Sequence, residues 1–158
     1  MGAIATKADY SVGALYKYFP TKDELYLRLV ESRADELLAE IRSTVIRSEG
    51  KEPKSAVLVD AVLSAFERKR KVFRLFLDAT SGFQWNIRGR LGKVVYERYR
   101  GFIAFVADLI EEERPRRRPR EMSAPDAALA LVGVLNSFLS HGMEERPERS
   151  LLEFRQPV

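Results

Sequence analysis

The sequence predicts an all-α protein with a small N-terminal helical head, a long connecting helix and a larger helical body. Apolar residues recur at three- and four-residue spacing along most of the 158 residues. No segment has the period-two alternation that a half-buried strand needs. Serine, threonine, glycine and proline residues fall between the periodic segments, where helices begin and end.

Composition narrows the classes of protein that the chain can belong to. A hydrophobic content of 46% is ample for a core, and the absence of cysteine excludes disulfides and thiolate metal sites. The net charge of +4 agrees with nucleic-acid binding, but only weakly, because charges of both signs are mixed. No apolar run approaches the roughly 18–20 residues that span a bilayer. We therefore predict a cytoplasmic protein with no membrane span, metal or cofactor.

A helix-turn-helix is predicted between residues 4 and 19. Asp9 and Tyr10 form a short break, and aspartate tolerates the left-handed backbone that tight turns need. Ser11 is a suitable N-cap for a second short helix, and Pro20 ends it. This second helix carries an apolar seam at three- and four-residue spacing, made of Leu15, Tyr18 and Phe19. Two helices joined by a tight turn suit a recognition helix in the DNA major groove.

This segment resembles the DNA-binding motif of the tetracycline-repressor (TetR) family of transcriptional regulators. The matching residues are Ile4, Ala5, Ala8, Ser11, Gly13, Leu15, Tyr16, Tyr18, Phe19, Lys22 and Leu25. One departure is Asp9-Tyr10, where the family usually has Gly-Val, so the larger Tyr10 could repack the turn. Beyond about residue 48 the resemblance is one of helical layout only.

The resemblance also implies roles for residues of the head. The start of the recognition helix would face base edges of a palindromic double-stranded DNA operator, through Ser11, Val12, Gly13 and Ala14. Positions matching Tyr16 and Lys22 commonly touch the DNA backbone in the family, and Lys17 can also reach a phosphate. Core packing is the preferred interpretation of Tyr18 and Phe19.

The head is predicted to continue into one long helix. Thr21 and Glu24 form a capping box, and the apolar pattern continues from residue 22 to about 48, roughly 40 Å of helix. The stretch 49–53 contains a glycine stop and a proline restart. We therefore place a head and linking helix at 1–48 and a ligand-binding and dimerisation domain at 49–158.

Further helices are predicted in the body at 55–69, 71–80, 90–113 and 123–145. An irregular segment at 83–89 holds the only tryptophan. Residues 114–120 form a basic run that we interpret as a solvated loop, although nucleic-acid binding is an alternative. Three apolar residues near the end resemble the opening of another amphipathic helix: Leu151, Leu152 and Phe154.

The body is rich in aromatic residues, which would suit an apolar cavity between helices. In the family, such a cavity binds an inducer. The residues that we expect to line it are Phe73, Phe76, Phe83, Trp85, Tyr99 and Phe102. The alternative, that these side chains simply fill the core, carries equal weight.

The segment 127–135 is apolar all round, so its helix should be covered on more than one side. In a chain this small, one covering surface could be a second subunit, and family layout also favours a homodimer through the 123–145 helix. The alternative is a central core helix in a monomer. His141, the only histidine, is expected to be partly buried on this helix.

Together these features predict a DNA-binding transcriptional regulator, a repressor that a small apolar ligand releases from DNA. Spacing supports no catalytic arrangement, so we do not expect an enzyme. Met1 lies three residues ahead of the family motif, which normally follows another helix, so we expect a head that lacks its first helix. The alternative function is a ligand-binding dimeric module whose incomplete head no longer binds DNA.

Overall fold

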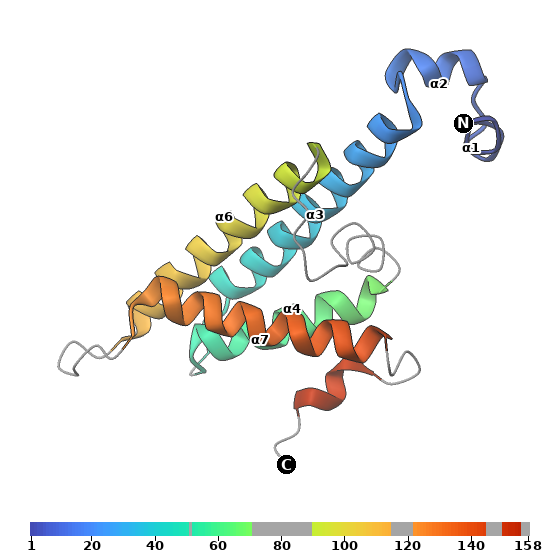
Figure 1. The fold of residues 1–158 in the computed structure, drawn as a ribbon. Helices are drawn as coiled ribbons and strands as arrows, with labels where there is room; N and C mark the ends of the chain where they lie inside the picture. Colours follow the sequence, from blue (N-terminus) through green and yellow to red (C-terminus); the bar gives the residue numbers. More distant parts are fainter. Residues whose placement is uncertain (51, 71–89, 115–121, 145–149, 156–158) are drawn as a thin grey trace.

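The computed structural model describes residues 1–50, 52–70, 90–114, 122–144 and 150–155. Within these residues every regular element is a helix, so the predicted all-α class is confirmed. The head lies at one end of a long helix, and the other helices gather around the opposite half of that helix (Figure 1).

The head is made of two short helices, α1 (Gly2–Lys7) and α2 (Val12–Tyr18). It continues into α3 (Lys22–Ile46), whose 25 residues make a rod roughly 37 Å long. The helix starts follow the predicted caps. Ser11 Oγ accepts from the Ala14 N–H at 3.0 Å, and Thr21 Oγ1 accepts from the Glu24 N–H at 3.1 Å. Each cap satisfies a backbone donor that the first helical turn cannot.

The body consists of α4 (Lys54–Arg68), α6 (Arg90–Glu113), α7 (Ala124–Glu144) and the short 3₁₀ helix η1 (Leu151–Arg155). Its core joins the second half of α3 to all of these elements. The most completely buried large side chains are Ile41, Val45, Leu58, Val106, Leu139 and Leu151. The long helix α3 therefore belongs both to the head and to the core, and α6 runs beside it (Figure 1).

Both ends of α4 are held by side chains and backbone groups from later in the chain. Its N-cap, Pro53, supplies no side-chain cap, but the Ser55 N–H donates to Glu113 Oε1 at 3.1 Å. At the other end, Glu67 Oε2 accepts from the Leu151 N–H at 2.9 Å, and the Leu151 side chain is almost fully buried. The chain therefore closes the body by docking η1 on α4.

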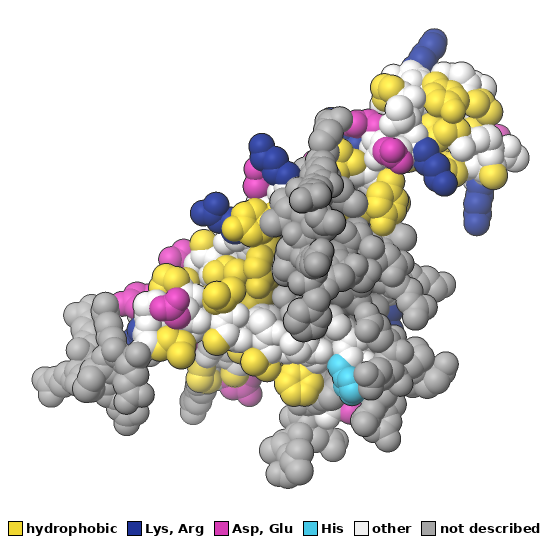
Figure 2. Space-filling model, viewed as in Figure 1, with side chains coloured by type: hydrophobic (Ala, Val, Ile, Leu, Met, Phe, Trp, Pro, Cys, Tyr) yellow, Lys and Arg dark blue, Asp and Glu magenta, His cyan; other side chains and the backbone are white. Residues whose placement is uncertain are grey.

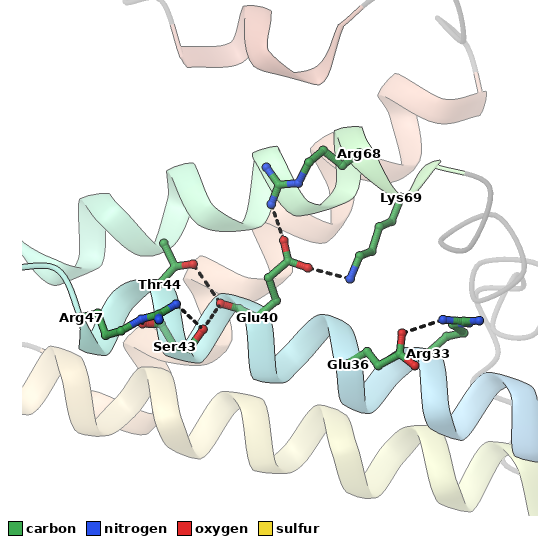
Figure 3. A network of polar contacts seen from close by, with 8 residues as sticks. All are labelled: Arg33, Glu36, Glu40, Ser43, Thr44, Arg47, Arg68 and Lys69. Carbon is green, nitrogen blue, oxygen red and sulfur yellow. Dashed lines mark hydrogen bonds and ion pairs between the residues drawn. The ribbon is translucent and has the colours of Figure 1, made fainter.

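A group of polar contacts links α3 to the end of α4 (Figure 3). The Glu40 carboxylate pairs with Arg68 and with Lys69, whose Nζ lies 2.6 Å from Oε2. Hydrogen bonds from Lys69 and Arg68 hold the pKa of the Glu40 carboxyl below its usual range. One carboxylate on α3 thus fixes two cations at the end of α4.

Predicted helix boundaries agree with the structure to within two residues, apart from those that fall outside the described residues. The third helix ends at Ile46 instead of near residue 48, because Arg47 and Ser48 close its last turn with bonds back to Ser43 and Val45. The predicted helix at 71–80 and the segment 83–89 lie outside the described residues. In place of the α-helical opening expected from residue 151, the chain forms 3₁₀ helix η1. No helix among the described residues is long and apolar enough to cross a membrane.

Candidate nucleic-acid interface

The turn between α1 and α2 adopts the backbone that its sequence predicts. Asp9 has φ 58°, in the left-handed region, where aspartate is among the few non-glycine residues found with some frequency. The Tyr10 N–H then donates to Ala5 O at 2.9 Å, and Ala5 is buried between the two helices. The turn is therefore fixed by a bond to the preceding helix.

The start of α2 presents a small-residue surface to solvent. Ser11 and Gly13 are exposed, Val12 is 43% exposed, and Ala14 is half-buried. A methyl group added at Gly13 would meet nothing within 4 Å. These four residues form a narrow, accessible strip with few hydrogen-bond donors, which allows a close approach to a groove but gives little direct base reading.

The residues expected to reach phosphates are all exposed on the same head. Tyr16 is 48% exposed, and Lys17 and Lys22 are exposed as well. Basic side chains, all of them lysines in this part of the sequence, project from the head among exposed hydrophobic ones (Figure 2). Lys22 is the first residue of α3, although Asp23 and Glu24 in the same turn oppose its positive charge. The arrangement leaves two cations and one hydroxyl exposed to solvent beside α2.

The prediction that Tyr18 packs in the core is wrong for the structure described. Its side chain is 73% exposed, whereas Leu15 on the same helix is buried and Phe19 is half-buried. The head holds only a small apolar interior, formed where Ala5 and Leu15 lie between α1 and α2. Apolar spacing showed that Leu15, Tyr18 and Phe19 lie on one side of the helix. It did not show that only Leu15 is buried there.

A guanidinium contact that the sequence did not suggest joins α3 to α6 within the body. Arg42 on α3 donates from Nη2 to the Gly101 carbonyl of α6 at 2.8 Å. Its guanidinium carbon also lies 5.3 Å from the centre of the Phe105 ring, a distance that permits a cation–π interaction. Because these partners are 59 residues apart, no local pattern could have found the contact.

Two of the six residues expected to bind a ligand can be placed. Phe102 is buried in the core and Tyr99 packs against that core from α6, where burial raises the pKa of its hydroxyl. Both positions agree with plain core packing as well as with a cavity wall. The other four lie outside the described residues: Phe73, Phe76, Phe83 and Trp85. The ligand site therefore stays a prediction.

The last long helix, α7, has one buried stripe and two exposed apolar flanks. Val134 and Phe138, one turn apart, are 53% and 46% exposed, and Leu129 on the opposite flank is 51% exposed. The side facing away from the core carries Ala130, Gly133 and Ser137. His141 is exposed, so its predicted partial burial is wrong within this chain. No cluster of potential metal ligands occurs among the described residues.

Comparison with known proteins agrees with this geometry. Residues 1–29 match the family described as bacterial regulatory proteins, tetR family. The nucleoid occlusion factor SlmA of Alteromonas mediterranea is 26% identical over 157 residues, which cover 95% of this chain and 78% of that protein. The solved structure of the fatty acid degradation regulator FadR from Bacillus halodurans has a TM-score of 0.76 at 18% identity, and the match covers 97% of this chain and 81% of that one.

The FadR likeness establishes the fold alone, while the motif match covers the head described above. The SlmA similarity extends across nearly the whole chain, so it includes the body as well as the head. The tetR-family motif of the head and the similarity to SlmA along nearly the whole chain support a DNA-binding regulator that resembles the tetR family of bacterial regulatory proteins.

Proposed function

We propose that the chain is a transcriptional repressor that binds a palindromic DNA operator as a homodimer and leaves it when a small apolar ligand binds the body. One observation carries the DNA-binding part of this proposal. A capped short helix presents its exposed strip, Ser11–Ala14, beside the exposed Tyr16, Lys17 and Lys22. This is the arrangement that groove reading with flanking phosphate contacts requires.

The proposed dimer forms through α7. Val134 and Phe138 leave a large apolar surface exposed, and the small residues Ala130 and Gly133 beside them would let a second helix approach closely. A dimer supplies two recognition helices, and a palindromic operator offers two half-sites about one duplex turn, roughly 34–36 Å, apart. Protein and DNA symmetry would then match.

Release by a ligand is a two-state proposal. A ligand that binds better to a body geometry with the wrong head spacing would shift the population away from the DNA-binding state. Support comes from α3, which carries head residues at one end and core residues Leu37, Ile41 and Val45 at the other. A movement of the core around α3 would therefore be carried to the head.

The dimer is tested by sedimentation of the unchanged chain and of Phe138→Glu. The unchanged chain should have about twice the mass of 18.1 kDa, and the buried charge in the variant should give monomers. Asp108→Lys, a charge change at an exposed position of α6, serves as the control and should stay dimeric. A monomeric unchanged chain at micromolar concentration would refute the interface.

DNA binding is tested with duplexes recovered from a random pool by the unchanged chain. Selected duplexes should contain an inverted repeat, and affinity should fall steeply as salt rises, because phosphate contacts release counterions. Fatty acyl compounds and aromatic compounds are then added to the complex. A chain that binds such compounds but selects no DNA would support the alternative of a ligand-binding module without DNA-binding activity.

A further inference from the structure

Tyr10 is an exposed aromatic residue of the head that the expected set of DNA contacts does not include. It is 61% exposed, and it lies in the turn directly before Ser11, at the recognition end of α2. The buried apolar residues of the head are Ala5 and Leu15. The Tyr10 ring is not among them, and most of its surface is exposed to water. Most of the Tyr10 side chain therefore lies outside the apolar interior of the head.

The backbone on both sides of Tyr10 is held in place. Its N–H donates to Ala5 O at 2.9 Å, and the next residue, Ser11, caps α2 through Ala14 at 3.0 Å. The preceding residue, Asp9, has φ 58°, a conformation that costs free energy for most side chains. A costly, fixed turn that projects an aromatic side chain into solvent suggests that the side chain serves a contact outside the chain.

We propose that Tyr10 is an additional DNA contact, and that its hydroxyl donates a hydrogen bond to a phosphate beside the groove that α2 enters. The inference rests on the proposed DNA-binding function and names one residue of that surface. Tyrosine hydroxyls are regular phosphate partners, and Tyr10 precedes the strip that would face base edges. Because Tyr10 precedes that strip, we place it beside the phosphate backbone at the edge of the groove, while Ser11–Ala14 face the base edges.

Tyr10→Phe removes only the hydroxyl and is compared with Tyr96→Phe, the same change at an exposed position of α6 in the body. Affinities are measured by fluorescence anisotropy on a palindromic duplex selected by the unchanged chain. Tyr10→Phe should bind about tenfold more weakly, the loss expected for a hydrogen bond to a charged group. Its salt dependence should stay unchanged, since a neutral donor releases no counterion. Tyr96→Phe should bind as the unchanged chain does.

The phosphate itself is identified with duplexes that carry a neutral methylphosphonate at one position at a time. At the contacted position, the unchanged chain should lose affinity while Tyr10→Phe loses nothing further. Equal affinity of Tyr10→Phe and the unchanged chain on the normal duplex would overturn this inference and leave the proposed function intact. A drop in thermal stability of Tyr10→Phe beyond that of Tyr96→Phe would also overturn it, since the hydroxyl would then serve the fold. Failure of the unchanged chain to bind any duplex would refute both.

Discussion

Arg98 on α6 donates two hydrogen bonds to Asp35 on α3, from Nε to Oδ1 at 2.8 Å and from Nη2 to Oδ2 at 2.9 Å. The Asp35 carboxylate raises the pKa of Arg98, chiefly through these bonds. Two turns further along α3, Arg42 makes the contact to Gly101 of α6 described above. The two guanidinium contacts hold α3 against α6 at two levels, between the head and the centre of the core.

The first prediction concerns the geometry of the Arg98–Asp35 pair. Arg98→Lys keeps the positive charge but cannot form two parallel bonds to one carboxylate. Because the Asp35 side chain is 58% exposed, the loss should be modest, about 0.5 kcal/mol in the free energy of unfolding. Urea denaturation measures it, with Arg100→Lys as the control, since Arg100 lies over the Tyr96 ring instead of a carboxylate. Equal losses in both variants would show that the two-point geometry contributes nothing.

A second prediction is a pH dependence of stability centred on Glu40. Its pKa is lowered in the folded state, so its ionised form stabilises the fold above the ordinary value of 4.5. That contribution is lost as the pH falls through the lowered folded value. Glu40→Gln should therefore be less stable than the unchanged chain by about 1 kcal/mol at neutral pH. The difference should shrink toward zero in acid, where the protonated glutamate resembles glutamine.

Thermal unfolding between neutral pH and strong acid measures this difference. Glu52→Gln is the matched control, since Glu52 is exposed in the connection before α4. Its stability difference from the unchanged chain should stay near zero throughout. A Glu40→Gln deficit that persists at the acid end would show that shape, and not charge, is what Glu40 contributes.

The third prediction is that Gly101→Ala stabilises the body. Gly101 lies inside α6, where glycine is less favourable than alanine by roughly 0.5–1 kcal/mol. A methyl group there would lie 3.7 Å from Arg42 Nη2, an ordinary contact distance, so no clash opposes the gain. Chemical denaturation should show a gain of that size, and Ala104→Gly, at an exposed position of the same helix, should show a loss of similar size. A destabilised Gly101→Ala chain would mean that the Arg42 contact cannot adjust.

Local features of this fold could be predicted because their causes lie within a few residues. Ser11 and Thr21 each accept from a backbone N–H three positions later, and each was identified as a cap from its neighbours. The left-handed Asp9 followed in the same way from the demands of a tight turn. The exposed strip of the candidate interface could be predicted because it begins at one of these caps.

Contacts between distant residues could not be predicted from spacing. Arg98 and Asp35 are 63 residues apart, and both belong to helix faces that look like ordinary mixed-charge surface. The prediction that Tyr18 is buried was wrong for a related reason. Helical spacing shows which residues share a face, but it does not show what covers that face. The ligand site stays untested, since Trp85 and its neighbours lie outside the described residues.

A fourth prediction concerns strain in the turn of the head. Asp9→Gly should raise the stability of the head by about 0.5 kcal/mol, because glycine adopts a positive φ without the steric cost of a Cβ atom. Asp9→Ala, which keeps the Cβ but loses the polar group that favours this conformation, should lower it. Hydrogen exchange at the Tyr10 amide reports on the turn directly, since that N–H is bonded to Ala5. Faster exchange in Asp9→Gly than in the unchanged chain would contradict the strain argument.

The last prediction separates a phosphate contact from general basicity. Lys22 is exposed at the first residue of α3, next to the recognition helix, whereas Lys93 is exposed on α6 in the body. Lys22→Ala should weaken binding to every duplex alike and should reduce the slope of log affinity against log salt by about one for each head of the bound dimer, because each head then releases one fewer counterion. Lys93→Ala removes the same charge from the chain and should change neither quantity. Equal effects of the two substitutions would mean that only the net charge matters. An unchanged slope in Lys22→Ala would mean that Asp23 and Glu24 already cancel the lysine, and the phosphate role would then have to be withdrawn.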